Sequence, residues 1–253
     1  MKRTTEELRE ALSLPEFPRS AGYDPDWMIA TFGGANAVWL TEALSEVMIL
    51  EPGMRVLDMG CGTAKSSIFL AREFDVEVWA TDLWVKADEN WQRIRDAGLE
   101  GRVFPIHAEA HALPFASEFF DASISMDAYH YFGTDDLYIR PYSRLVKPGG
   151  QLGIIVPGLV EELSGPVPEH LAPYWVWDFC SFHSPAWWRR HWEKSEQVEV
   201  ELADMTADGW KHWLHWNEVC LRQADREDSD ENRMLRADAG QHLGLTRVVA
   251  RRK

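Results

Sequence analysis

The sequence predicts an α/β fold, in which a doubly wound, mostly parallel sheet of seven strands carries helices on both faces. Three observations favour this class. Strand-like and helix-like segments alternate along residues 55–158, and parallel strands need such helical crossovers. Two further strand-like segments lie at 198–205 and 246–252. A length of 253 residues suits one domain with an insertion.

The chain before the first strand is predicted to be helical. A helix over 4–12 begins with Thr4 and Glu7 at the spacing of a capping box. A second helix, over 35–48, has apolar residues at helical intervals and follows two adjacent glycines.

Between residues 55 and 158, five strands alternate with three helices. The predicted strands are 55–59, 76–83, 102–110, 121–128 and 149–158. The predicted helices are 64–73, 86–98 and 135–146, the last bent by Pro141. Because crossovers between parallel strands are right-handed, the loops that follow the strands gather at one edge, where ligands of such sheets bind.

The carboxyl-terminal part adds helices around its two strand-like segments. One helix begins at Ser184 and Pro185, which are typical first residues of a helix, and two more are predicted over 208–222 and 230–240. We expect 246–252 to close the sheet as its last strand. The chain is thus predicted to be one domain, 1–253, divided into the regions 1–50, 51–160 and 161–253.

The amino-acid composition argues against several classes of binding partner and cellular location. The formal net charge is −15, so the surface repels nucleic-acid phosphates and no nucleic-acid partner is expected. The polar first residues lack the apolar stretch of a signal peptide, and no run approaches the ~18 apolar residues of a membrane span. The three cysteines lie far apart in the sequence, which argues against a disulfide framework. We therefore expect a cytoplasmic protein, and composition leaves the oligomeric state open.

Residues 55–66 read RVLDMGCGTAKS and join an apolar strand to two glycines. A P-loop is excluded because Met59 stands where its first glycine belongs, and a dinucleotide motif lacks its third glycine, where Lys65 stands. The carboxylate of Asp58 would also repel a pyrophosphate. A ligand with an ammonium and a sulfonium has the opposite preference. S-adenosylmethionine carries both, together with a carboxylate that suits a helix N-terminus.

The second strand ends in Asp82. An acid at this place can accept hydrogen bonds from the two hydroxyls of a ribose, although nicotinamide enzymes share the pattern. The alternative role is a helix cap. If the ribose binds here, we expect Asp82→Ala to weaken cofactor binding by about 1.5–3 kcal/mol and to leave the melting temperature nearly unchanged.

Residues 30–160 resemble the class I S-adenosylmethionine-dependent methyltransferases, specifically the small-molecule branch that includes the ubiquinone/menaquinone C-methyltransferases. Four motifs in the family's order carry the resemblance: VLDMGCGTA (56–64), ATDLW (80–84), AEAHALPFASEFFDASISMDAYHYF (108–132) and LVKPGGQLGIIVP (145–157). The resemblance implies a Rossmann-like fold, S-adenosylmethionine as the cofactor and methyl transfer as the activity.

The resemblance also implies which residues hold the methionine part of the cofactor. Gly60 and Gly62 match the glycines that let the backbone approach it, and Asp58 matches the acid that organises their loop and favours the positive charge. The backbone of Asp127 falls where the family holds the methionine ammonium. Residues 1–50 would fold over the cofactor as a helical lid.

The adenosine part is assigned in the same way. Asp82 matches the acid that binds the ribose, and Leu83 matches the apolar residue beside the adenine. Glu109 stands where the family usually has Asp and would take the adenine amino group. The backbone N–H of Ala110 would bind a ring nitrogen.

The methyl acceptor is expected beside residues 127–132, DAYHYF, which follow the fourth strand. Methyl transfer from a sulfonium is an in-line displacement, and a base is needed only if the nucleophile must lose a proton. Tyr129 and His130 are the catalytic candidates, with His130 as a general base near neutrality. Local packing of His130 is the alternative.

Residues 177–185, WDFCSFHSP, follow the fifth strand and offer Trp177, Asp178 and His183 as substrate contacts, with a structural role as the alternative. Eight of the thirteen tryptophans lie between 175 and 216. They form either a core or an aromatic-walled pocket, which suits flat apolar acceptors, amines or sulfides. No acid cluster follows the fifth strand, so no metal is expected.

We therefore expect an enzyme that transfers a methyl group from S-adenosylmethionine to a small-molecule acceptor, although a protein target stays open. Two alternatives are a nicotinamide-dependent oxidoreductase and a non-catalytic S-adenosylmethionine-binding or interaction protein. The missing third glycine counts against the oxidoreductase.

Overall fold

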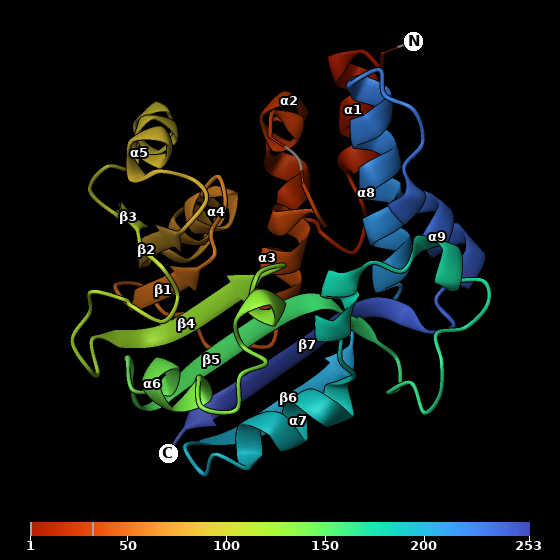
Figure 1. The fold of residues 1–253 in the computed structure, drawn as a ribbon. Coiled ribbons are helices and arrows are strands. Elements are labelled where there is room, and N and C mark those ends of the chain that lie inside the picture. The colour runs from red at the N-terminus through yellow and green to blue at the C-terminus, as the bar shows by residue number, and fades with distance from the viewer. Residues whose placement is uncertain (1, 32) are drawn as a thin grey trace.

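The computed structural model describes residues 2–31 and 33–253, and a seven-stranded sheet forms its centre (Figure 1). The strands lie side by side in the order β3-β2-β1-β4-β5-β7-β6. Their bounds are β1 Arg55–Met59, β2 Glu77–Asp82, β3 Val103–His107, β4 Phe120–Met126, β5 Val146–Leu159, β6 Val198–Met205 and β7 Leu243–Arg252.

The predicted mostly parallel sheet is confirmed. Strands β1 to β5 pair in parallel, whereas β7 is antiparallel to both of its neighbours, β5 and β6. The segment expected to join the sheet as its last strand is β7, and it lies between β5 and β6. The chain steps outward from β1 to β3 and then returns to the other side of β1 with β4. A reversal of this kind opens a crevice at the carboxyl ends of the two central strands.

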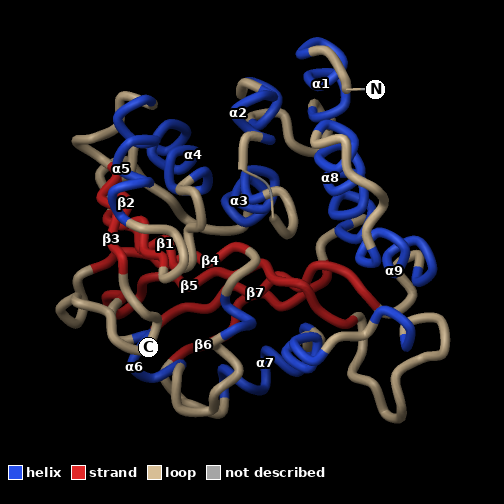
Figure 2. Tube along the Cα trace, turned by 45° about the horizontal axis from the view of Figure 1, so that its top comes forward, coloured by secondary structure: helices blue, strands red, loops and turns tan. Residues whose placement is uncertain are grey.

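Helices cover both faces of the sheet. Their bounds are α1 Thr5–Leu12, α2 Pro25–Ile29, α3 Ala37–Ser45, α4 Lys65–Phe74, α5 Ala87–Asp96, α6 Ile139–Ser143, α7 Pro185–Glu193, α8 Gly209–Gln223 and α9 Asp230–Asp238. Figures 1 and 2 show α6 and α7 on one face, and α3, α4 and α5 on the other. Within the described residues, no helix is long and apolar enough to cross a bilayer.

Local sequence signals explain where several helices begin. The capping box of α1 is confirmed, with Thr4 and Glu7 bonded reciprocally, and the Ser184 hydroxyl accepts the N–H of Trp187 at the start of α7. The helix predicted over 135–146 is shorter than expected and spans only α6. Pro141 lies in the first turn of α6, where a residue without an N–H is tolerated, so the helix begins just before it.

The amino-terminal helices pack against α8, which lies almost two hundred residues further along the chain. The backbone N–H of Arg3 donates to Gln223, and the ring of His215 bonds the carbonyl of Ala11 at 2.7 Å. An apolar core that includes Leu8 and Trp216 joins the two segments. The first residues of the chain and the tryptophan-rich part therefore form one helical layer at this end of the molecule (Figure 1).

Candidate active site

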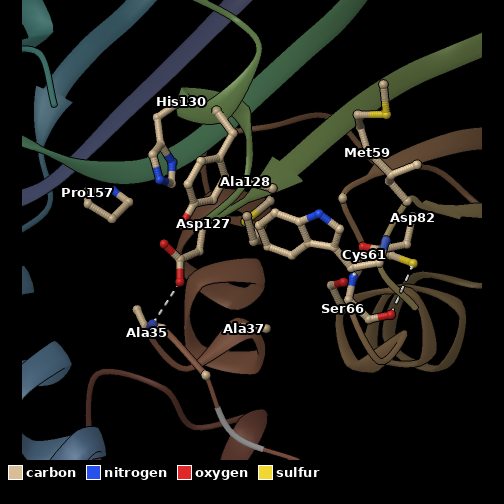
Figure 3. Close-up of a pocket in the computed structure, with 18 of the residues that line it drawn as sticks. Ala35, Ala37, Met59, Cys61, Ser66, Asp82, Asp127, Ala128, His130 and Pro157 are labelled. Atoms are coloured by element: carbon tan, nitrogen blue, oxygen red, sulfur yellow. Dashed lines mark hydrogen bonds between the residues drawn. The ribbon is translucent and has the colours of Figure 1, made fainter. Parts of the chain in front are cut away.

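A cavity of about 690 Å³ opens at the carboxyl ends of β1, β2 and β4, where the strand order reverses (Figure 3). The loop after β1, the end of β2 and the segments after β3 and β4 line one part of it. The segment before α3, residues 178–182 and helices α8 and α9 line the rest. This volume suits a small organic ligand together with a second small molecule.

Asp58 lies beneath the loop that follows β1. The carboxylate is buried, and its Oδ2 accepts hydrogen bonds from the hydroxyls of Ser66 and Ser67, each at 2.6 Å. Burial raises the pKa of Asp58 to about 6. Asp58 thus fixes the start of α4 relative to β1, and its side chain does not belong to the described lining of the cavity.

The glycines of this loop have backbone conformations that favour glycine. Gly60 and Gly62 have φ angles of 72° and 53°, in the left-handed region. A side chain at Gly60 would collide with Ala128, whereas no atom lies within 4 Å of the place where Gly62 would carry one. Gly62 therefore leaves open space on the cavity side of the loop. Ala64, the last residue of the VLDMGCGTA motif, also has a left-handed φ of 60°.

Asp82 ends β2 at the cavity and has structural partners already. Its Oδ2 accepts the N–H of Gly62 at 2.8 Å, and its Oδ1 accepts the N–H groups of Trp84 at 2.7 Å and Val85 at 2.8 Å. The carboxylate thus ties the loop after β1 to the loop after β2. Each carboxylate oxygen can accept more than one hydrogen bond, so Oδ2 retains capacity for a ligand.

The predicted adenine-side residues lie together at the rim. Leu83, Glu109 and Ala110 all line the cavity, and Leu83 is about half exposed. Glu109 accepts the N–H of His111 at 2.7 Å and pairs with its ring at 2.8 Å. These bonds lower the pKa of Glu109, so the carboxylate is charged at neutral pH.

Asp127 follows β4 and faces the segment before α3 across the cavity (Figure 3). Its Oδ2 accepts the backbone N–H of Ala35 at 2.9 Å, and a side chain at Gly34 would collide with that carboxylate. Burial raises the pKa of Asp127 to about 7; the Ala35 hydrogen bond opposes this shift, and the charge of Glu231 adds to it. The residues that precede α3 thus close over the end of β4.

His130 lines the cavity, and Tyr129 does not. The His130 ring is 3% exposed, its Nδ1 lacks a hydrogen-bond partner among the described residues, and burial lowers its pKa to about 4. The ring is therefore neutral at physiological pH, and titration near neutrality is not supported. Tyr129 points the other way, into a core with Trp188 and Trp192 at ring distances of 5.7 and 5.5 Å. The single turn at 129–131 sends these adjacent side chains to opposite sides, so the placement of Tyr129 does not favour a catalytic role, which stays a prediction.

The two substrate candidates after β5 lie outside the cavity. Trp177 is 86% exposed, and His183 stacks on Trp187 at 3.6 Å and bonds Glu162 through Nδ1 at 3.1 Å. Neither residue belongs to the described lining of the cavity, so their roles as substrate contacts stay predictions that this placement does not favour. Their neighbours line the cavity instead, namely Asp178, Phe179 and Phe182.

Helices α8 and α9 supply a further wall. Trp213 and Trp216 line the cavity, whereas Trp188 and Trp192 are core residues. The tryptophan-rich region therefore forms part of the core and also an aromatic wall of the cavity. Glu231 of α9 also lines the cavity and accepts the Trp213 indole N–H at 2.6 Å. Glu231 ends the charged run DREDSDE (225–231), which is typical of a solvated loop, so no sequence pattern predicts its place in the cavity.

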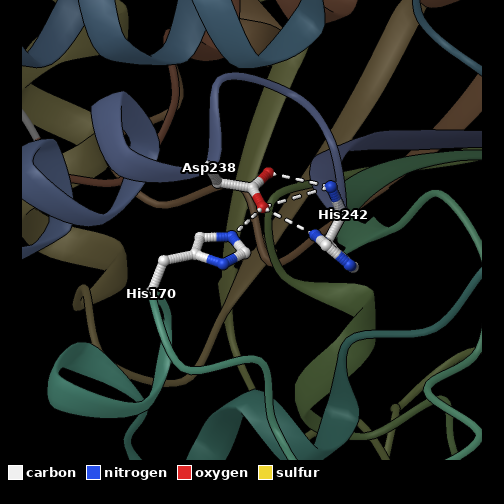
Figure 4. Close-up of side chains that lie close together, drawn as sticks. All are labelled: His170, Asp238 and His242. Carbon is white, nitrogen blue, oxygen red and sulfur yellow. Dashed lines mark hydrogen bonds and ion pairs between the residues drawn. The ribbon is translucent and has the colours of Figure 1, made fainter.

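A second cluster lies apart from the cavity lining, where His170, Asp238 and His242 meet (Figure 4). The buried Asp238 Oδ1 lies 3.0 Å from His170 Nε2 and 3.1 Å from His242 Nδ1. Asp238 also accepts the N–H groups of His242 and Leu243. These bonds join the end of α9 to β7 and account for the cluster without an ion, and the absence of a metal stays a prediction.

Known proteins share part of this sequence. Residues 56–150 match the family model described as a methyltransferase domain. The methyltransferase GfsG of Streptomyces halstedii is 33% identical over 138 residues, which cover 51% of this chain and 48% of that protein. The ubiquinone/menaquinone biosynthesis C-methyltransferase UbiE of Vibrio parahaemolyticus is 32% identical over 158 residues, or 60% of this chain and 56% of that protein. The chain thus spans about half the length of the curated relatives it matches.

The fold has solved counterparts as well. The phosphoethanolamine N-methyltransferase 2 of Haemonchus contortus, solved with phosphomonomethylethanolamine and S-adenosylhomocysteine, superposes with a TM-score of 0.71 at 17% identity. The match covers 97% of this chain and 60% of that one, and at this identity it establishes the fold. Residues 56–150 therefore match a methyltransferase domain, and the chain resembles the class I S-adenosylmethionine-dependent methyltransferases of the UbiE type.

Proposed function

We propose that this protein transfers the methyl group of S-adenosylmethionine to a small molecule bound in the same cavity. The observation that carries the proposal is the junction of Gly62 and Asp82. An open glycine loop and a ligand-accessible carboxylate meet there at the sheet's switch point. The methyltransferase-domain match over the same segment supports it.

The residues present fit this cofactor. Asp82 would accept the ribose hydroxyls, Leu83 would contact the adenine, and Glu109 with the N–H of Ala110 would bind its polar edge. The space beside Gly62 would take the methionine part, and Asp127 would bind its ammonium through the backbone or the carboxylate. When bound, the sulfonium supplies an activated methyl group.

The residues of the chain would promote methyl transfer mainly by positioning the methyl acceptor. The buried, neutral His130 can donate or accept one hydrogen bond and so orient an acceptor beside Asp127. With its lowered pKa, His130 is a weak base, whereas the pKa of Asp127 near 7 suits proton acceptance better. A general base is required only if the acceptor carries a proton that must leave.

The family model and the relatives named above are methyltransferases, and they give no support to the nicotinamide-dependent alternative or to a non-catalytic role. The loop itself also disfavours a dinucleotide, because Lys65 stands at the third glycine of that motif and donates to the carbonyls of Met28 and Thr31. We further propose a cytoplasmic location and no nucleic-acid partner, in line with the net charge of −15.

The test is a screen of metabolite pools with S-adenosylmethionine labelled in its methyl group. We expect one small-molecule fraction to gain the label with the wild-type chain and not with Gly62→Val, which would fill the open space beside the loop. Binding of S-adenosylhomocysteine without label transfer to any small molecule would favour a non-catalytic role, and labelled protein would favour a protein target.

A further inference from the structure

We propose that the acceptor end of the cavity selects a cationic ligand with an apolar body, such as an amine, and rejects anions. This inference rests on the proposed function and specifies the substrate class of the same site. It derives from the charges and rings at this end of the cavity, among which Asp127 alone is also a predicted cofactor contact.

Three carboxylates converge on this end of the cavity: Asp127, Asp178 and Glu231. Asp178 Oδ1 is buried and has no hydrogen-bond partner among the described residues. Glu231 receives the N–H groups of Trp213 and Asn217, both at 2.6 Å and both on Oε1. All three carboxylates act on the side chain of Tyr131. Each of them raises the pKa of Tyr131, after the larger effect of its burial.

No cation of the described lining offsets these charges. Lys65 is the one lysine or arginine among the described residues that line the cavity, and its ammonium is bonded to the Met28 and Thr31 carbonyls. No ion pair involving the carboxylates of Asp127, Asp178 or Glu231 is found among the described residues. His130, 3% exposed and unpartnered at Nδ1, is neutral here and offers a single polar contact.

Aromatic rings form the rest of this wall. Phe179 and Phe182 stack with ring centroids 4.6 Å apart, and Phe182 meets Trp213 edge-on at 6.5 Å. Trp216 lies one helical turn beyond Trp213 on α8 and also lines the cavity. Ring faces attract cations and take up apolar carbon, and desolvation strengthens both effects.

The carboxylates and the aromatic rings together determine that the cavity prefers a cationic ligand to an anionic one. An anionic acceptor would bring a further negative charge into a partly buried site with three carboxylates, where Coulomb repulsion is weakly screened. An ammonium gains from the same field. Aromatic rings alone would accept a neutral molecule, so the carboxylates are the selective element.

For an amine acceptor the reaction balances without a further reactant. The nitrogen lone pair forms the new bond to the methyl carbon as the carbon–sulfur bond breaks, and the sulfonium becomes a thioether. The proton of a protonated primary, secondary or tertiary amine must leave before this step. A cavity carboxylate, such as that of Asp127, can accept it and release it to solvent.

The test is isothermal titration calorimetry with three probes of similar size: benzyltrimethylammonium, benzyl alcohol and benzoate. Each is titrated into the full chain with and without saturating S-adenosylhomocysteine. We expect the cation to bind at least tenfold more tightly than benzyl alcohol, and benzoate to bind more weakly still. Benzoate or benzyl alcohol binding as tightly as the cation would overturn the inference.

Substitutions in the cavity test whether the carboxylates cause the preference for the cationic probe. Glu231→Gln keeps the acceptor for Trp213 and should weaken cation binding at least fivefold, while affinity for S-adenosylhomocysteine stays within twofold. Asp178→Asn should do the same on a separate segment, and Glu227→Gln, which removes a charge from an exposed residue near α9, should change neither. Unchanged cation binding in both cavity variants would contradict the inference. A failure of S-adenosylhomocysteine to bind, with the charge order intact, would instead contradict the proposed function.

Discussion

Asp82 offers the sharpest test of cofactor binding, because its carboxylate has structural and ligand-binding roles that two substitutions can separate. Asp82→Ala removes the acceptor of three backbone N–H groups, those of Gly62, Trp84 and Val85. At about 1 kcal/mol for each bond, the free energy of unfolding should fall by about 2–4 kcal/mol. These three hydrogen bonds therefore contradict the expectation from sequence that the melting temperature would hardly change.

Asp82→Asn keeps one carbonyl oxygen for Trp84 and Val85, but its NH2 group replaces the oxygen that accepts the Gly62 N–H, so one of the three hydrogen bonds is lost. Its melting temperature should lie much closer to that of the wild type. Its affinity for S-adenosylhomocysteine should still fall by about 1.5–3 kcal/mol, or roughly 10- to 150-fold, because charged hydrogen bonds to the ribose are lost.

Thermal unfolding and calorimetry measure the two quantities on the same samples. Asp88→Asn, an exposed acid in the first turn of α5, removes an equal charge nearby and should leave both unchanged. A folded Asp82→Asn protein with wild-type affinity for S-adenosylhomocysteine would place the ribose elsewhere.

Four further predictions concern the cavity walls and Tyr129 behind them. His130→Ala should lower turnover at least tenfold, about 1.4 kcal/mol of barrier, with S-adenosylhomocysteine affinity within threefold; a wild-type rate would leave His130 with a packing role. Because burial lowers the pKa of His130 to about 4, below its unfolded value near 6.5, its contribution to the free energy of unfolding is complete above pH 6.5. Urea unfolding should show that contribution being lost as the pH falls toward 4, and His130→Gln should reduce this slope. Gly34→Ala places a side chain against the Asp127 carboxylate at a φ of 63° and should lower the melting temperature, whereas Gly33→Ala meets open space and should not. Tyr129→Phe removes a buried hydroxyl without a described partner and should leave turnover unchanged, and a large loss would restore its catalytic role.

Much of the fold could be predicted from local signals. The alternation of apolar strands and helices gave the sheet, and the glycines of RVLDMGCGTAKS marked the loop that borders the cavity. Leu83, Glu109, Ala110 and Asp127 lie around the same cavity because each follows the carboxyl end of a parallel strand. Their places depend on topology, which the motif order specifies. Their roles in binding stay predictions.

The acceptor side was harder to predict, since several of its residues lie in single turns and loops rather than in strands or long helices. In the single turn at 129–131, Tyr129 points into a core and His130 into the cavity, and sequence could not separate the two. Likewise, no sequence pattern could show that Phe182 lines the cavity while Trp177 and His183 do not. Glu231 reaches the cavity only because α9 packs beside α8, a contact that no local pattern specifies.

The most direct measurement is calorimetric titration of the wild-type chain with S-adenosylhomocysteine and, separately, with NAD. We expect S-adenosylhomocysteine to bind with a dissociation constant in the micromolar range, about −7 to −8 kcal/mol, and NAD to bind far more weakly. Binding of NAD tighter than that of S-adenosylhomocysteine would contradict the assignment of this cavity to S-adenosylmethionine.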